Sequence, residues 1–188
     1  MVEAYWLGNP MLERVSGTLL AAHLDDRFAK RAGRGWNDLA MLAVSGGRAH
    51  HNFHVFAVYP WVGMLRAGFE EQPLRVLNLC RVRWGTVLTI HSGGMAQVLS
   101  SPLDWNGHRL SLGQARPQTA TLSAAQARTI RPGDTVSLHW DWVCETLTPQ
   151  QLRRLSHYTT TQLRLANSSK ITSAPKPIAV SLTSPAAR

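Results

Sequence analysis

The segment "LRVLNLCRVRWGTVLTI", Leu74 to Ile90, decides the predicted fold because its side chains alternate between two sets with a period of two residues. A period of two is typical of a strand whose two faces meet different surroundings. In that register one face carries Val76, Asn78, Cys80, Val82 and Trp84, and the other carries Leu77, Leu79, Arg81 and Arg83. The sequence therefore predicts that helical periodicity gives way to strand periodicity around Pro73.

Further short strands follow at intervals of roughly ten residues. The segment "HSGGMAQVLS" is a glycine turn leading into a strand, and Asn106-Gly107 is the strongest short hairpin signal. The segment "RPGDTVSLHWDWVC" is a turn followed by another alternating strand. This spacing predicts a small antiparallel barrel or sandwich.

The residues before Pro73 have helical periodicity. Leucine and valine recur every three or four residues after Asn9, a plausible N-cap, up to Gly33 and Gly35. A second helix is predicted over "WNDLAMLAV", and a buried segment bent near Pro60 over "HHNFHVFAVYPWVGMLRAG". The apolar start "EAYWLGNP" suggests that a preceding portion could cover this surface.

The C-terminal part returns to a helical pattern in "TPQQLRRLSHYTTTQLRLAN", with Thr148 as N-cap and Pro149 in the first turn. We therefore predict an α+β protein with an N-terminal helical domain followed by a small OB-like β-barrel with a C-terminal helix. The predicted boundaries are 1–72 for the helical domain, 73–167 for the barrel with its helix, and 168–188 for a disordered, Ser/Pro/Ala-rich tail.

The composition fits a soluble globular protein of one or two domains, with 188 residues, 44% of them hydrophobic and 16% charged. No apolar run approaches the ~20 residues that cross a bilayer, and the start lacks signal-peptide features, so we expect a cytoplasmic protein. Residues 1–70 carry seven basic and six acidic side chains, a net charge of +1, and residues 71–188 carry thirteen and five, a net of +8. The basic second part suits nucleic acid, an anionic ligand or an acidic protein.

Two cysteines in a chain of this length do not form a disulfide framework, so Cys80 and Cys144 are expected to be free thiols or metal ligands. Positive charge on Arg81 and Arg83 would lower the pKa of Cys80 and favour a metal-binding thiolate. Spacing alone favours a small packed residue instead. Strand alternation places Cys144 on a predicted core face, which makes it a packing residue.

Histidines form two further candidate sites. His139 and Asp141 share a strand face, where the carboxylate would orient the imidazole for metal binding or acid–base chemistry, although a solvated face is the commoner interpretation. The motif "HHNFH" contains His50, His51 and His54, of which the first and last are four residues apart and can bind one metal ion on a helix. The H-E-x-x-H pattern of zinc proteases is absent, and histidines satisfied by other contacts are the commoner interpretation.

Several short motifs occur in a recognisable order. They comprise Cys80 with Gly85, then Met95, Ala96 and Val98, then Gly133, Asp134, Val136 and His139, followed by the C-terminal helix. This order resembles the HypC/HupF family of small [NiFe]-hydrogenase maturation chaperones over about residues 76–165. The whole chain also resembles uncharacterised actinobacterial proteins that contain "VEAYWLGNP" and "HHNFHVFAVYPWVG".

The HypC/HupF resemblance implies an OB-like barrel and an accessory role in metallocentre assembly rather than an enzyme. It implies that Cys80 and His139 transiently bind iron carrying cyanide and carbonyl ligands, with Asp141 orienting His139. The implied partners are a hydrogenase large-subunit precursor and a HypD-type scaffold protein. Two departures are the 79 residues before Cys80 and a longer insert between the second and third motifs.

Two other functions fit the same residues. An OB barrel with a basic, aromatic surface is typical of single-stranded nucleic-acid-binding modules. In that case Trp84 and Trp105 would stack on bases, and Arg83 and Arg109 would contact phosphates. A metal-dependent enzyme that uses His50, His51 and His54 is the third hypothesis.

Overall fold

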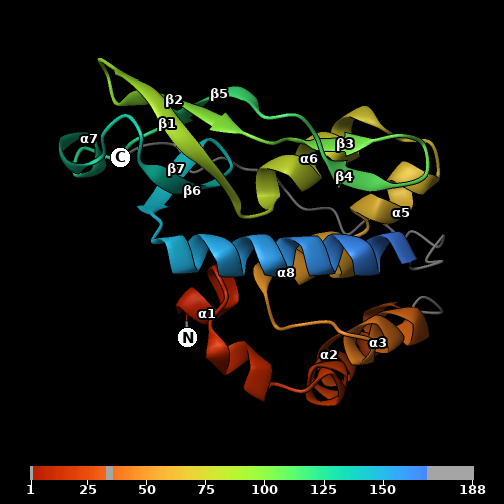
Figure 1. Ribbon diagram of the computed structural model, residues 1–188. Coiled ribbons are helices and arrows are strands. Elements are labelled where there is room, and N and C mark those ends of the chain that lie inside the picture. The colour runs from red at the N-terminus through yellow and green to blue at the C-terminus, as the bar shows by residue number, and fades with distance from the viewer. Residues whose placement is uncertain (1, 33–35, 169–188) are drawn as a thin grey trace.

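Helix α8 (Pro149–Ser168) lies between the N-terminal helices and a β-barrel (Figure 1). This computed structural model describes residues 2–32 and 36–168. Helices come first, then the barrel, then α8, so the predicted α+β class is confirmed. Apart from Ser168, the predicted tail lies outside the described residues, as do Gly33 and Gly35.

Five strands close into a barrel in the order β1-β2-β5-β7-β6. Their bounds are Arg83–His91 (β1), Met95–Ser100 (β2), Arg116–Thr121 (β5), Thr135–His139 (β6) and Trp142–Thr146 (β7). The barrel is mixed rather than wholly antiparallel, because β5 pairs with β7 in parallel. Inward side chains fill its interior, among them Val87, Ala96, Val98, Ala120, Val136 and Leu138.

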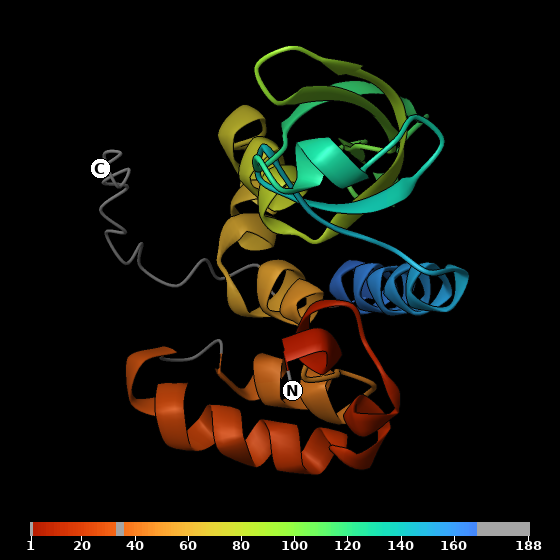
Figure 2. The same cartoon turned by 90° about the vertical axis from the view of Figure 1, so that its left-hand side faces the viewer.

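The long insert after β2 supplies a hairpin, a barrel strand and a short helix. Strands β3 (Leu103–Trp105) and β4 (Leu110–Leu112) pair across the predicted Asn106-Gly107 turn. Gly107 has a φ of 88°, which favours glycine, and the Asn106 side chain accepts from the backbone N–H groups of His108 and Arg109. Helix α7 (Gln126–Thr129) lies across an end of the barrel in Figure 2.

Helix α6 (Glu71–Cys80) occupies the first part of the segment for which a strand was predicted. Pro73 stands in its first turn, where a missing N–H is tolerated. Pro73 and Leu77 are four residues apart and both buried, so they lie on one helical face. Cys80 is consequently the last residue of a helix, and β1 begins only at Arg83.

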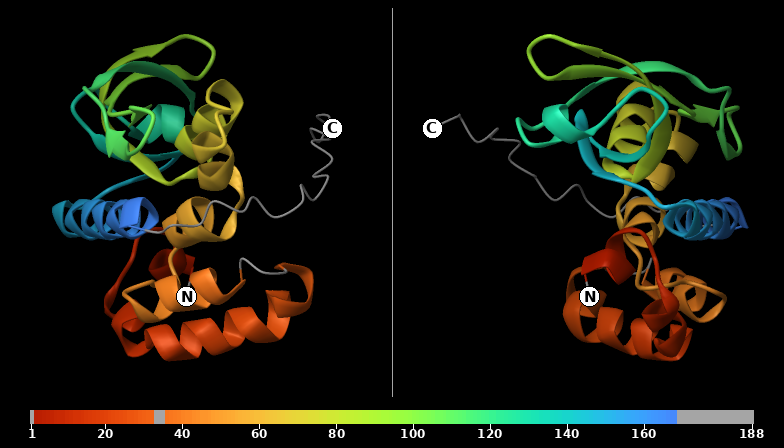
Figure 3. Two further views of the ribbon diagram at one scale, coloured as in Figure 1. Left: turned by 90° about the vertical axis from the view of Figure 1, so that its right-hand side faces the viewer. Right: turned by 60° about the vertical axis from the view of Figure 1, so that its left-hand side comes forward.

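The N-terminal part contains several helices beneath α8 (Figure 3). The single helix predicted after Asn9 is divided, because the chain becomes extended at Val15. Asn9 does cap the first piece, since its side chain accepts from the Met11 N–H at 3.0 Å. The helices are α1 (Val2–Trp6), the 3-10 helix η1 (Pro10–Arg14), α2 (Gly17–Ala32) and α3 (Trp36–Val44).

The buried segment predicted around Pro60 is helical on both sides of that residue. It comprises α4 (His51–Phe53), the π-helix η3 (His54–Val58) and α5 (Trp61–Arg66). Val55 and Leu65 of this segment share a hydrophobic cluster with Leu77 and Leu163. One core therefore contains residues from both sides of the predicted boundary at 72/73, and that boundary stays a prediction.

None of the helices within the described ranges combines the length and the apolar character needed to span a membrane.

His50 is fully buried and begins α4 as its N-cap. Its Nδ1 accepts from the Asn52 N–H at 3.1 Å, and its ring stacks on Tyr158 at 5.3 Å between centroids. Burial, assisted by neighbouring His51, lowers the pKa of His50 to about 3. The folded protein therefore holds this imidazole neutral where the unfolded chain would protonate it.

We expect acid to destabilise the fold through His50. Its folded pKa is depressed below the unfolded value of roughly 6.5, so its contribution is fully present above that pH and is lost as pH falls towards 3. Between about pH 6.5 and about pH 4.5 the loss should be roughly 2–3 kcal/mol. Denaturant unfolding of His50→Asn, which keeps a capping acceptor but has no group that titrates in this range, should show a loss smaller by that amount. Identical pH dependence in both proteins would contradict this assignment.

Candidate metal centre

Three side chains that can bind a metal meet beside the barrel: His51, Cys80 and His139. Each offers one ligand atom, and the three atoms all lie within 4.8 Å of one another. They come from the start of α4, the end of α6 and the end of β6. Thiolate and imidazole together suit Zn²⁺, Cu, Ni and Fe, and the cluster can therefore hold a transition-metal ion.

Asn52 determines where His51 lies. Its buried amide accepts from the Val82 N–H at 2.8 Å and donates to the hydroxyl of Thr159 at 2.8 Å. These bonds fix α4 against α8 and against the α6–β1 link that follows Cys80. In addition, His51 Nε2–H donates to the Cys80 carbonyl at 2.8 Å. The backbone of the two candidate ligands is thus held in register by hydrogen bonds.

The turn after β6 places His139. Trp140 adopts the left-handed conformation, with a φ of 52°, and reverses the chain towards β7. Its N–H donates to the Leu79 carbonyl at 2.8 Å, and its carbonyl accepts from the Arg83 guanidinium. The end of β6 is therefore attached to the end of α6, which brings His139 to Cys80.

The hydrogen bonds also define which ring nitrogens are available. Because the Cys80 carbonyl can only accept, His51 carries its proton on Nε2. Nδ1 is then the nitrogen that can bind a metal ion, which would replace the Tyr5 hydroxyl that it accepts from at 3.2 Å. His139 Nε2 is buried and has no hydrogen-bond partner among the described residues. A buried polar atom without a partner is unfavourable, and a metal ion at the cluster would satisfy it.

Trp6 covers the two imidazoles. Its ring centroid lies 4.7 Å from that of His51 and 4.7 Å from that of His139. Tyr5, its neighbour in α1, contacts His51 edge-on at 5.5 Å. Aromatic side chains from the N-terminal helix thus shield the site from bulk water.

Burial controls protonation at the cluster. It lowers the pKa of His51, and it lowers the pKa of His139 to about 4 with help from His51 and Arg83. Both rings are neutral at pH 7, the form that binds metal. Burial raises the pKa of Cys80, so this residue is a thiol until an ion displaces its proton.

The expectation that Arg81 and Arg83 lower the pKa of Cys80 is wrong, because both guanidinium groups point elsewhere. Arg81 is buried and donates to the Ser101 carbonyl at 2.5 Å. Arg83 is buried and donates to Gln118 Oε1 at 2.6 Å as well as to Trp140. Arg81 thus connects the end of α6 to the loop between β2 and β3, and Arg83 connects β1 to β5 and to the β6–β7 turn.

The "HHNFH" motif does not act as one unit. Because α4 begins at His51, His50 has an extended backbone and stacks on Tyr158 instead of projecting beside His54. His54 Nδ1 lies 3.4 Å from the Tyr5 hydroxyl, which His51 also contacts. Of the three histidines, the structure brings only His51 to Cys80 and His139.

Asp141 lies apart from this cluster. It is exposed in the β6–β7 turn, and no hydrogen bond joins it to His139 within the part of the chain that the structure describes. Its charge acts instead on Arg83, opposing the burial that lowers the pKa of that guanidinium. Cys144 is half-buried in β7 and does not belong to the cluster.

The four residues expected to contact nucleic acid are dispersed. Arg83 is buried within the protein. Trp105 packs into the cluster beneath the β3–β4 hairpin, whereas Trp84 packs into a different cluster with Val82. Arg109 follows the Asn106-Gly107 turn. Of the four, Trp84 alone lines the groove along α8.

Sequence reasoning did not identify the role of His51 with Cys80, or that of Tyr5 and Trp6. The sequence does contain one indication of such contacts, because the polar residues His50, His51 and Asn52 interrupt an apolar, aromatic segment. Buried polar side chains need partners, so such a run predicts specific contacts without naming them.

Comparison with known proteins identifies a family whose function is unknown. The profile of a family of unknown function (DUF6390) matches residues 1–173. No curated protein and no solved structure matches the chain.

The predicted membership of the HypC/HupF family is wrong, because the matching family spans the helices and the barrel alike and no HypC/HupF match is found. The shared motifs are turn glycines and alternating strand residues, which small barrels need for physical reasons. The expected hydrogenase precursor and HypD-type partners lose the support of that resemblance.

Proposed function

Because the chain belongs to this family of unknown function, we propose its function from the cluster of His51, Cys80 and His139. The protein binds one transition-metal ion through these three side chains. It serves as an accessory protein that delivers the ion to another protein, and it is not an enzyme.

The observation that carries this proposal is the convergence of three ligand atoms, within 4.8 Å, from three separate elements. The neutral state of both rings supports it, since burial lowers the pKa of His51 and of His139 and so leaves them in the metal-binding form. A thiolate with two imidazoles accommodates Zn²⁺, Ni²⁺, Cu⁺ or Fe²⁺. Iron, the metal expected from the sequence, is therefore one of the ions to be compared.

Delivery is favoured over a permanent structural role by the number of ligands. Structural zinc sites use four protein ligands, whereas three leave one tetrahedral position open. A donor atom from a recipient protein can fill that position before any bond to the delivering protein breaks. Exchange then needs no free ion.

The test is metal loading followed by transfer. The protein should bind one equivalent of Co²⁺, with the intense near-ultraviolet absorption of a cobalt–thiolate bond. When the loaded protein is mixed with a peptide containing two cysteines, the transfer rate should increase with peptide concentration. A rate that ignores peptide concentration would mean that the ion leaves first, which contradicts delivery. Absence of stoichiometric binding would contradict the whole proposal.

A further inference from the structure

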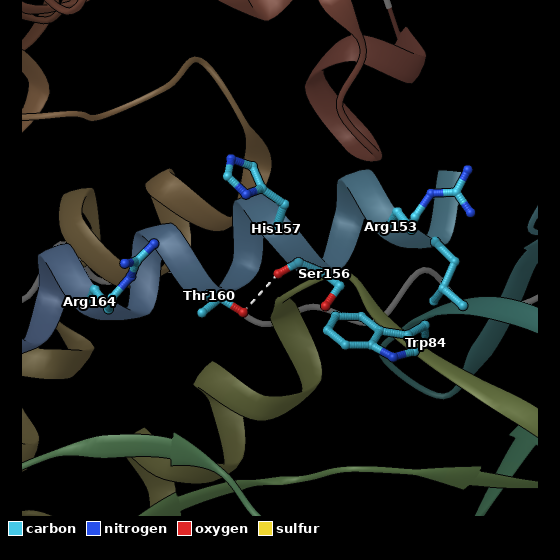
Figure 4. Close-up of a pocket in the computed structure, with 7 residues that line it drawn as sticks. Trp84, Arg153, Ser156, His157, Thr160 and Arg164 are labelled. Carbon is cyan, nitrogen blue, oxygen red and sulfur yellow. Dashed lines mark hydrogen bonds between the residues drawn. The ribbon is translucent and has the colours of Figure 1, made fainter. Parts of the chain in front are cut away.

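A second candidate site lies on the exposed face of α8, where a groove of about 660 Å³ runs along the helix. Six of its lining residues are labelled in Figure 4: Trp84, Arg153, Ser156, His157, Thr160 and Arg164. Trp84 comes from β1 and the others from α8. None of them belongs to the metal cluster.

The groove is positively charged. Helix α8 contains three arginines and no acidic residue in its 20 positions. Arg153 and Arg164 are exposed, and neither forms an ion pair with any residue in the described ranges. Their charges are therefore available to an anionic ligand.

Trp84 gives the groove an aromatic edge. It is half-buried and packs against a cluster that includes Val82 and Leu155. This packing fixes the indole ring while leaving part of it at the groove. A rigid, partly exposed indole in the same groove as arginines is the kind of platform on which nucleic-acid bases stack.

The hydroxyl groups between the arginines add polar contacts. Thr160 Oγ1 donates to the Ser156 carbonyl at 2.9 Å, the dashed line in Figure 4, and can still accept. The Ser156 hydroxyl lies between Trp84 and the helix backbone. Such groups commonly contact phosphate and sugar.

The spacing of the charges indicates a chain-like ligand. Arg153 and Arg164 are eleven residues apart, which is about 16 Å along a helix, too far for both to bind one phosphate group. A ligand that satisfies both arginines carries anionic groups along its length and a flat group near Trp84. We propose that this groove binds a short segment of single-stranded nucleic acid, with Arg153 and Arg164 on phosphates and Trp84 against a base.

An open groove fits this ligand better than a small nucleotide does. Small-molecule sites enclose most of their ligand, whereas strand-binding grooves leave it accessible along one side. The Arg153, His157, Thr160 and Arg164 side chains are all exposed to solvent. This inference is independent of the proposed metal delivery.

The test measures fluorescence anisotropy of a labelled oligothymidine of about ten nucleotides. The double variant Arg153→Ala/Arg164→Ala should bind at least about tenfold more weakly near 50 mM salt, and its salt slope should be smaller by about 1.4, the value for two lost phosphate contacts. Trp84→Leu should weaken binding at least about fivefold through lost stacking. Cys80→Ser should bind like the native protein, which separates this site from the metal cluster.

The matched control is Arg116→Ala/Arg128→Ala, which removes two exposed charges from β5 and α7. It should weaken binding by less than about threefold, through long-range electrostatics alone. Equal losses in the two double variants would overturn the proposal, since binding would then reflect net charge. So would an absence of binding by the native protein, or equally effective competition by an acidic peptide.

Discussion

Replacing Cys80 by serine should abolish the near-ultraviolet cobalt–thiolate absorption and lower the affinity for Co²⁺ and Zn²⁺ at least about 100-fold. Loss of a group that merely orients a ligand already reduces affinity by about 10–100-fold, so loss of the ligand itself should reach the upper end. Serine preserves the size of the side chain, but its hydroxyl is a far poorer ligand for these ions. Equilibrium dialysis and absorption titration measure the two effects.

The chain contains its own control in Cys144, the second free cysteine. It is half-buried like Cys80 and is not one of the three candidate ligands, although it hydrogen-bonds the His139 backbone and the Trp6 side chain. Serine can keep those contacts, so Cys144→Ser should retain both the absorption band and the affinity. His50→Asn should also retain them, because His50 faces Tyr158. Metal binding that survives unchanged in Cys80→Ser would exclude the cluster as the site.

Replacing Asn52 by alanine should lower the free energy of unfolding by about 3 kcal/mol and weaken metal binding as well. The amide is completely buried, and its removal leaves the Val82 N–H without its partner at 2.8 Å. Thr159 loses a donor, although its own hydroxyl still bonds the Leu155 carbonyl at 2.7 Å. Urea unfolding of the metal-free protein gives the stability change.

Asn167→Ala provides the comparison for this effect. Asn167 likewise makes two side-chain hydrogen bonds, accepting from the Leu110 N–H at 2.9 Å and donating to the Leu110 carbonyl at 2.8 Å, but it attaches β4 to the end of α8. Its loss should destabilise the protein while leaving metal affinity unchanged in the folded state. If both variants changed metal affinity equally, Asn52 would have no particular role in placing His51.

The parts of the fold that the sequence predicts correctly have local causes. The β3–β4 hairpin follows from Asn106-Gly107, whose side chain and backbone freedom define the turn. Helix α8 begins at a reciprocal cap, in which Thr148 Oγ1 accepts from the Gln151 N–H and Gln151 Oε1 accepts from the Thr148 N–H. Such signals need no knowledge of distant residues.

Helix α6 shows why periodicity alone misleads. A pattern that repeats every two residues also repeats every four, and residues four apart share a helical face. Pro73 and Leu77 satisfy either interpretation. The packing of α6 against other helices and against the β3–β4 hairpin favours the helix. A local sequence pattern carries no information about those distant contacts.

The candidate site was only partly predictable for a similar reason. The order of motifs pairs Cys80 with His139, whereas their proximity depends on the hydrogen bond between the Trp140 N–H and the Leu79 carbonyl. The sequence grouped His51 with His50 and His54 because neighbours in a motif suggest one site. The N-cap conformation of His50 separates them, and the Asn52 contacts carry His51 to different partners.

The wide separation of the three ligands along the chain orders events in the life of the protein. His51 and Cys80 precede the barrel strands, but His139 ends β6, which pairs with β1 and, through β7, completes the barrel. A ribosome-bound chain that has not yet released β6 therefore lacks the complete ligand set. In the proposed function, metal capture would therefore have to follow the synthesis of β6, when β7 and α8 are still to be added.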